Sequence, residues 1–144
     1  MGQIKIHGIA EYLQPVKVGL SEVIHACVVE ALQFPKEKRG QRFFPMDRAD
    51  FFIPGGQGRT EHYTIVEISM FEGRSVDAKK KLVRLLFERI DTAVGISPAD
   101  IEITITETPR HNWGFRGQTG DEIGLDYKVN VQIGEPHIAF LSVS

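Results

Sequence analysis

The same order of secondary-structure signals occurs twice in this chain of 144 residues. The centres of two expected strands, Ile6 and Ile68, are separated by about 60 residues, and so are two prolines that follow expected helices, Pro35 and Pro98. A period of this length is too long for a solenoid repeat and is typical of a duplicated β-α-β unit. The duplication therefore restricts the chain to a small number of α/β arrangements.

The chain is expected to form one domain. Its length is a common size for a single domain, and its composition, 42% hydrophobic and 25% charged, is that of an ordinary globular protein. We expect one domain over residues 1–144, with pseudo-repeats at about 2–60 and 61–124. The remaining tail, residues 125–144, is expected to contribute edge strands.

The first half is expected to contain a strand, a helix and a short second strand. Residues 4–9, IKIHGI, alternate apolar and polar side chains, which predicts a half-buried strand. Apolar residues then recur at steps of three and four, which predicts a helix from about Pro15 to Leu32. Residues 41–46, QRFFPM, have the composition of a short strand.

The second half repeats this order with clearer signals. Residues 62–70, HYTIVEISM, are rich in β-branched side chains and predict a strand. A helix is expected from about Ser75 to Val94, and Gly95 suits its left-handed C-cap. Residues 100–107, DIEITITE, form the clearest alternating segment and predict the last strand.

Two such units predict an α/β (α+β) fold with a four-stranded sheet. Because β-α-β crossovers are right-handed, both helices are expected on one face of the sheet. The opposite face then needs another cover, and a second subunit supplies it most simply. We therefore expect an oligomer.

The bulk properties exclude several classes of protein. A net charge of −2 gives no attraction to nucleic acid or to anionic membranes, and no apolar run reaches the ~20 residues that a membrane helix needs. The single cysteine, Cys27, cannot form an internal disulfide, which favours a cytoplasmic location. The five histidines lack paired metal-ligand spacing, so neither a metal site nor a cofactor is expected.

The segment after the last strand combines aromatic and cationic residues. Trp113 and Phe115 stand among Arg110, His111 and Arg116. Apolar walls with a few fixed charges are typical of a ligand pocket, and the planar guanidinium of arginine suits a carboxylate. An equally weighted interpretation is that the two aromatic residues plug the end of the sheet while the arginines are solvated.

A second cationic candidate, Arg74, follows the third strand in the turn Glu72–Ser75. Its position near a helix N-terminus favours an anion, because backbone N–H groups point the same way. A lone arginine in such a turn is also typical of a surface charge.

This turn and its helix resemble a known family. Residues 70–90, MFEGRSVDAKKKLVRLLFERI, resemble the strand, turn and helix of the tautomerase superfamily, whose longer branch has two tandem units. Residues 111–117, HNWGFRG, resemble the Trp-x-Phe segment of the malonate semialdehyde decarboxylase group. The match covers residues 2–117 in the same order, and the W-G-F-R-G and T-G-D-E runs resemble uncharacterised members.

The resemblance implies a homotrimer with pockets at the subunit edges. In this family an amino-terminal proline on the first strand acts as general base or acid, and an arginine in the turn holds a substrate carboxylate. The turn arginine corresponds to Arg74, and the aromatic wall corresponds to Trp113 and Phe115.

Three positions depart from the family pattern. The catalytic proline falls on Gly2, whose α-amine would take that place if Met1 is removed. The first turn arginine of the decarboxylase group is Glu72, and its water-activating aspartate falls at Lys38. Decarboxylation and hydration by the family's usual route are therefore not expected.

The resemblance and the residues together predict an isomerase that moves a proton on a small 2-keto or enol carboxylic acid. Arg74 would hold the carboxylate, and Arg110 or Arg116 would stabilise the enolate oxygen. The Gly2 amine or His111 would carry the proton. The alternatives are a carboxylate-binding protein that has lost its base, and a purely structural trimer.

Overall fold

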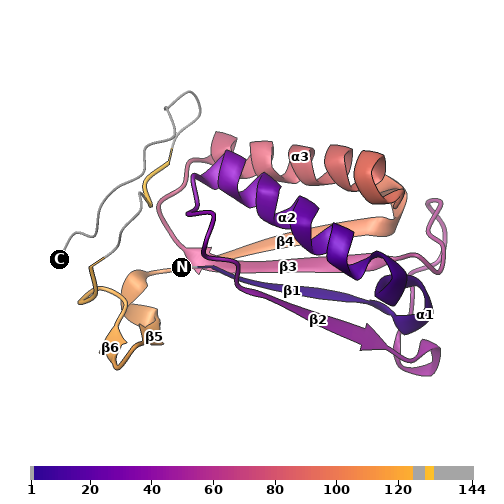
Figure 1. Cartoon of the computed structure of the whole chain (residues 1–144), viewed down its shortest axis with the longest axis horizontal. Helices are drawn as coiled ribbons and strands as arrows, with labels where there is room; N and C mark the ends of the chain where they lie inside the picture. The colour runs from indigo at the N-terminus through magenta and orange to yellow at the C-terminus, as the bar shows by residue number, and fades with distance from the viewer. Residues whose placement is uncertain (1, 125–128, 132–144) are drawn as a thin grey trace.

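The computed structural model of the chain describes residues 2–124 and 129–131. Its first layer is a four-stranded sheet in the order β2-β1-β3-β4. The strands are β1 (Gly2–Ile9), β2 (Gln41–Met46), β3 (Thr64–Phe71) and β4 (Ile101–Thr108). The second layer consists of two long helices, α2 (Lys17–Leu32) and α3 (Val76–Val94), which lie side by side over one face (Figure 1).

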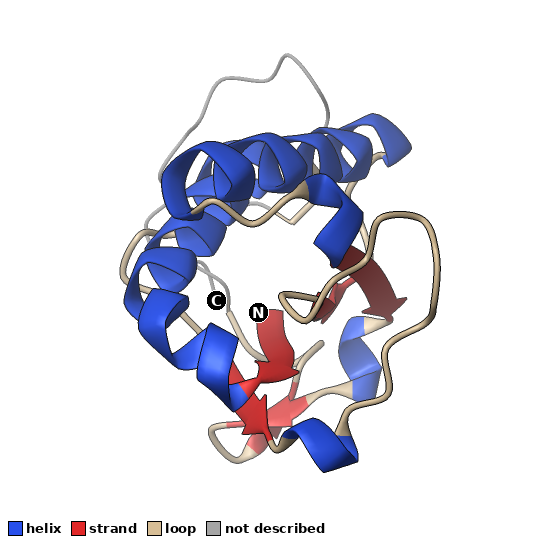
Figure 2. Ribbon diagram, turned by 90° about the vertical axis from the view of Figure 1, so that its right-hand side faces the viewer, coloured by secondary structure: helices blue, strands red, loops and turns tan. Residues whose placement is uncertain are grey.

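Short elements connect these layers. Helix α1 (Ala10–Leu13) and a 3-10 turn (Gln14–Val16) lead directly into α2. Further 3-10 turns are found at Arg48–Asp50, Pro98–Asp100 and Arg110–Asn112, and a small hairpin pairs β5 (Gly114–Phe115) with β6 (Gln118–Thr119). The predicted four-stranded sheet with both helices on one face is confirmed, and Figure 2 shows the same arrangement from the side.

The first helical segment begins earlier than predicted. Helical structure begins at Ala10, and Pro15 lies within the 3-10 turn that joins α1 to α2. Proline lacks an N–H donor and constrains the preceding turn, so it interrupts the α-helical hydrogen bonds locally without ending the helical path. The sequence predicts a start at about Pro15 because the regular apolar stripe is formed only by the later residues.

Helix α3 has well-defined ends. At its start the Ser75 side chain accepts a hydrogen bond from the backbone N–H of Ala78 at 3.1 Å. At its end Gly95 adopts the left-handed conformation, with φ of 76°, and its N–H donates to the Asp91 carbonyl at 3.0 Å. The predicted glycine C-cap is confirmed.

Strand direction decides which residues meet at one edge of the sheet. Strand β1 is antiparallel to β3, and β3 is parallel to β4. The beginning of β1 therefore lies beside the ends of β3 and β4. In the register, Gly2 pairs with Met70, and Met70 pairs with Glu107, so these three residues form a row across the sheet.

The core lies between the helices and the sheet. It is built from apolar side chains of both halves, including Ile6, Ile24, Val66, Leu82, Leu86 and Ile90, which are fully buried. Cys27 is buried in this core, as expected, and burial raises the pKa of its thiol to about 11. The thiol is therefore protonated at neutral pH and is a poor nucleophile.

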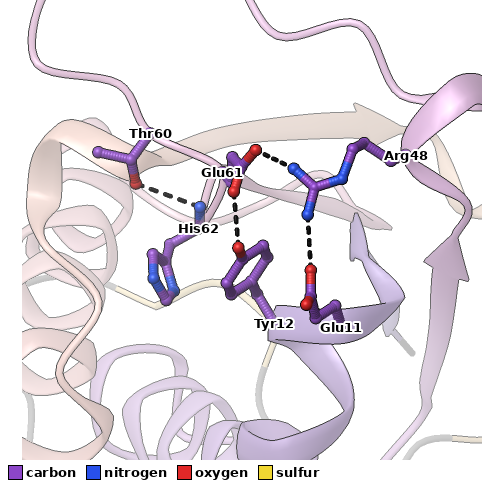
Figure 3. A network of polar contacts seen from close by, with 6 residues as sticks. All are labelled: Glu11, Tyr12, Arg48, Thr60, Glu61 and His62. Atoms are coloured by element: carbon purple, nitrogen blue, oxygen red, sulfur yellow. Dashed lines mark hydrogen bonds and ion pairs between the residues drawn. The ribbon is translucent and has the colours of Figure 1, made fainter.

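The opposite end of the sheet carries a polar network that fastens the connection between the halves (Figure 3). Arg48 forms ion pairs with Glu11 of α1, at 2.6 Å, and with Glu61. Tyr12 also donates to Glu61, at 2.6 Å, and its ring packs against His62. These side chains are largely exposed, so the network stabilises the arrangement of the connecting segment and adds little free energy per pair.

The sheet face opposite the helices has a mixed surface. Gln3, Lys5 and His7 of β1 project to this face, and so do Ile65, Glu67 and Ser69 of β3. His7 stacks on Phe44 of β2 with ring centroids 4.9 Å apart and lies 3.6 Å from a Glu67 carboxylate oxygen. Among residues 2–124 and 129–131, no helix covers this face.

Part of the predicted tail lies beside the start of α3. The predicted edge strands of residues 125–144 lie mostly outside the described residues. Of the described part, the Val131 carbonyl accepts a hydrogen bond from the Ser75 N–H at 2.8 Å, and Val131 is buried. None of the helices in the described ranges has the length and apolar character required to cross a bilayer.

Candidate functional site

The most unusual side chain at the Gly2 edge of the sheet is Arg74. It follows β3 in the turn before α3 and is only 5% exposed. Its Nη1 donates to the Phe71 carbonyl at 3.1 Å, and the guanidinium carbon lies 5.3 Å from the centre of the Phe34 ring. Its Nε and Nη2 are buried, and neither has a hydrogen-bond partner within the described part of the chain.

Burial also changes the acidity of this group. Loss of hydration lowers the pKa of Arg74 to about 10, and the nearby negative charge of Glu107 opposes this shift. At neutral pH the guanidinium therefore remains protonated. A buried cation with two unused donors is costly to maintain unless an anion completes its hydrogen bonds.

Gly2 lies next to the same aromatic ring. It is buried at the start of β1, and a Cβ added there would lie 3.0 Å from the Phe34 Cζ atom. A cavity of about 10 Å³, enough for roughly one water molecule, is lined in part by Gly2, Phe34 and Lys38. The Phe34 ring therefore contacts both sequence-predicted groups, Gly2 and Arg74.

A carboxylate that was not singled out from the sequence, Glu107, completes this edge. Its Oε1 lies 2.5 Å from the Lys79 Nζ of α3. Its Oε2 is buried and has no hydrogen-bond partner among the described residues. A signal was available, because Glu107 continues the alternating positions of Ile103 and Ile105 and so places an acid on the helix-covered face of β4.

Aromatic side chains stack at the end of the sheet. The Phe71 ring is fully buried and meets Trp113 edge-on, with centroids 5.2 Å apart, and Phe115 at 6.1 Å. The Trp113 Nε1 donates to the Thr108 hydroxyl at 2.6 Å, which fixes the indole against the end of β4. The predicted aromatic pair therefore packs at the sheet end, with Phe71 as a partner that the sequence did not indicate.

The cations of the loop have separate environments. The Arg110 Nε donates to the Gly120 carbonyl at 2.9 Å, and its Nη2 donates to the Ile123 carbonyl at 2.8 Å. Its guanidinium also lies over Phe71, at 5.7 Å. Arg110 thus connects two parts of the loop through hydrogen bonds to its backbone. This role differs from both predicted alternatives, which are a place in a ligand pocket and full solvation.

Two further predicted residues of the loop are exposed. Arg116 has a left-handed backbone, with φ of 53°, and its guanidinium lies 5.3 Å from the centre of the Phe115 ring. His111 is exposed in the preceding 3-10 turn. Arg74 and Gly2 are therefore brought together through Phe34, while His111 and Arg116 lie on the surface of the chain.

The family follows from a comparison with known proteins. The family model described as "Tautomerase enzyme" matches residues 38–116, which is more than half of the chain. The chain belongs to the tautomerase family. The predicted membership of the tautomerase superfamily is confirmed.

Proteins similar in sequence to this tautomerase-family chain are named as tautomerases. A probable tautomerase, YrdN, of Bacillus subtilis (strain 168) is 29% identical over 99 residues, which cover 67% of this chain and 76% of that protein. A 2-hydroxymuconate tautomerase of Comamonas testosteroni is 34% identical over 58 residues, covering 40% of this chain and 92% of that protein.

Solved structures confirm the fold. A malonate semialdehyde decarboxylase superposes with a TM-score of 0.72 at 22% identity, covering 81% of this chain and 92% of that chain. A fused 4-OT superposes with a TM-score of 0.73 at 16% identity, covering 83% of this chain and 97% of that chain. The tandem β-α-β architecture predicted from the repeat is therefore shared with these proteins.

Proposed function

We propose that this tautomerase-family protein transfers a proton on a small 2-keto or enol carboxylic acid, whose carboxylate is held by Arg74. The observation that carries the proposal is the buried guanidinium at the Gly2 edge of the sheet, two of whose donors have no partner among residues 2–124 and 129–131. Relatives named as tautomerases support the reaction class.

The physical reason for a carboxylate ligand is the cost of the buried charge. A guanidinium presents its donors in a planar fork that matches two carboxylate oxygens, and charge-assisted hydrogen bonds of this kind are the strong ones. In Arg74 one donor is used by the Phe71 carbonyl, which leaves Nε and Nη2 on adjacent positions of the fork. A bound carboxylate would satisfy both.

The proton carrier we propose is the α-amine of Gly2, exposed by removal of Met1. Gly2 falls at the place of the family's amino-terminal proline, and its position beside Phe34 brings it to the same edge as Arg74. A free α-amine has an ordinary pKa near ~8, so a fraction of it is unprotonated at neutral pH and can accept a proton. His111 remains the second candidate.

The loop residues would complete the site. Trp113 and Phe115 would exclude water next to the carboxylate. Of the two arginines proposed to stabilise the enolate oxygen, the hydrogen bonds of Arg110 to backbone carbonyls favour Arg116 for this role. Because Arg116 is exposed in one subunit, a neighbouring subunit is part of the proposal.

We further propose a homotrimer. The sheet face opposite the helices carries Ile65 and the stacked His7–Phe44 pair, and burial of this face by identical subunits would remove these side chains from water. Two solved fused 4-OT structures with the same fold are named as trimers, with TM-scores of 0.70 and 0.71.

A ketonisation screen tests the proposed reaction. A panel of 2-hydroxy-dienoic and enol acids is followed by ultraviolet absorbance with the native protein, with Arg74→Ala and with Arg84→Ala, a matched control on the exposed side of α3. We expect acceleration of at least one enol acid, lost in Arg74→Ala and kept in Arg84→Ala. Equal rates for the native protein and Arg74→Ala would contradict the assignment.

A carboxylate-binding protein without turnover is the second candidate, because Gly2 follows Met1 and its nitrogen is a non-basic amide unless Met1 is removed. Mass spectrometry of the intact chain separates the two. Met1 retained and acylated on every molecule would eliminate the amine as the proton carrier. Binding of carboxylates without any ketonisation would then favour the second candidate.

A further inference from the structure

An acceptor without a partner among the described residues lies at the same end of the sheet as the unused donors of Arg74. The Oε2 of Glu107 is buried without a partner among the described residues, in the same way as the Nε and Nη2 of Arg74. The two groups are near enough for the Glu107 charge to act on the Arg74 guanidinium. The edge of the sheet therefore presents donors and an acceptor together.

The strand register explains this placement. Met70 is paired with Gly2 on one side and with Glu107 on the other, so Glu107 lies two strand spacings, roughly 10 Å, from Gly2. Arg74 follows β3 by a few residues, and its Nη1 bonds back to Phe71. The acceptor is thus on the β4 side of Arg74, and Phe34 with Gly2 is on the other side.

Lys79 pairs with only one of the two carboxylate oxygens of Glu107. Its Nζ lies 2.5 Å from Oε1, and both side chains are partly buried. A carboxylate has accepting positions on both oxygens, so the ion pair leaves Oε2 without a donor. A buried ionised oxygen that lacks a donor costs more than an equivalent neutral group.

We propose that Glu107 is a specificity-determining residue of the Arg74 site, whose Oε2 accepts a hydrogen bond from a hydroxyl group on the carbon next to the ligand carboxylate. This inference rests on the proposed carboxylate site and adds to it. The ligand carboxylate fills the donors of Arg74, and its 2-hydroxyl or enol O–H fills the acceptor of Glu107. Both sets of unused polar atoms are satisfied by one small molecule.

Such a site discriminates between ligands because a poorly matched ligand leaves a buried polar atom of the protein without a hydrogen bond. A carboxylic acid without the hydroxyl would leave the Glu107 oxygen buried and without a donor, so the site should reject it more strongly than the lost contact alone suggests. A second carboxylate in the position of the hydroxyl would face like charge from Glu107. The preferred ligands therefore carry a single carboxylate at the end that enters the site, with a hydroxyl group on the adjacent carbon.

Equilibrium titration with two related probes tests this inference. Phenylacetate and each enantiomer of mandelate differ by one hydroxyl next to the carboxylate, and their rings suit the aromatic wall. Calorimetry is done on the native protein, on Glu107→Met and on Glu88→Met. The last variant is a control with the same change of side chain, because Glu88 is exposed on α3, away from the sheet face proposed for assembly.

We expect the native protein to bind one mandelate enantiomer at least about tenfold more tightly than phenylacetate, since tenfold corresponds to ~1.4 kcal/mol, which a hydrogen bond to a charged group usually contributes. The ratio should fall to about one in Glu107→Met and stay unchanged in Glu88→Met. If Glu107→Met does not fold, as judged by circular dichroism, Glu107→Gln takes its place and should lower the ratio several-fold, because a neutral acceptor is weaker.

The outcomes separate this inference from the proposed function. If the ratio in the folded Glu107 variant equals that of the native protein, the role of Glu107 is refuted while the carboxylate site stands. If the native protein binds phenylacetate with Arg74-dependent affinity but shows no preference for mandelate, the inference is also refuted. If neither probe binds the native protein, both the inference and the proposed carboxylate site are contradicted.

Discussion

At the residue scale, Arg74 carries a buried positive charge whose hydrogen bonds are incomplete among the described residues. This arrangement is unfavourable for folding and favourable for binding an anion. Burial lowers its pKa to about 10, which means that the native structure disfavours the charge that the unfolded chain carries freely. Functional sites often retain such costs, because the group must be ready for a partner. Stability and binding are therefore expected to respond in opposite directions when Arg74 is changed.

We predict that Arg74→Met raises the free energy of unfolding by about 1–3 kcal/mol, because an apolar side chain of similar length removes a buried and incompletely paired charge. The folded pKa lies below that of the unfolded chain, so the cost in the native protein is present in full below about pH 10 and shrinks above it. Denaturant unfolding at pH 7 and pH 10.5 measures this. Destabilisation at pH 7 would mean that Arg74 is a structural residue.

At the scale of elements, the helix that follows Arg74 depends on its own cap. Ser75 accepts from the Ala78 N–H, and its backbone N–H donates to the Val131 carbonyl. The cap orients the turn that carries Arg74, since the two residues are adjacent. Loss of the cap would therefore loosen both the helix start and the site.

We predict that Ser75→Ala lowers the free energy of unfolding by about 1 kcal/mol, the usual cost of losing an N-cap side chain. Thermal unfolding measures the change. Ser97→Ala serves as the control, because Ser97 caps only the 3-10 turn Pro98–Asp100 and should cost less. A larger effect at Ser97 than at Ser75 would refute this ranking.

Sequence patterns predicted the elements well and the polar contacts less well. The strands and the C-terminal ends of α2 and α3 follow from alternation, apolar stripes and the Gly95 cap, all of which are local signals. The roles of Arg110 and Glu107 depend on contacts between distant segments: Arg110 bonds to Gly120 and Ile123, and Glu107 pairs with Lys79. No spacing rule indicates such pairs, although an acid on an apolar strand face is a usable sign.

At the scale of the whole molecule, the duplicated unit gives a two-layer domain that has helices on one side only. Strand β1 of the first half pairs with β3 of the second half, and this antiparallel pairing joins the two halves into one continuous sheet. One face of that sheet has no helix in the described ranges. Arg74 follows the end of β3, at one end of the same sheet. Assembly would cover the face and bring further residues to the edge.

We predict that the protein is a trimer in light scattering at micromolar concentration, and that Ile65→Arg shifts it to monomer. Ile65 lies on the sheet face without helices, on the central strand β3, where a buried charge would be costly. Val18→Arg is the matched control, since Val18 is 69% exposed on the helix side and should not affect assembly. A native monomer would contradict the shared-site arrangement.

The central claim is that Arg74 holds a carboxylate. Its most direct test is a calorimetric titration of phenylacetate and phenylacetamide, which differ in charge but little in shape, into the native protein and Arg74→Ala. We predict that the native protein binds the acid and not the amide, and that Arg74→Ala loses this preference while keeping its circular dichroism spectrum. An undiminished preference for the acid in Arg74→Ala would contradict the account.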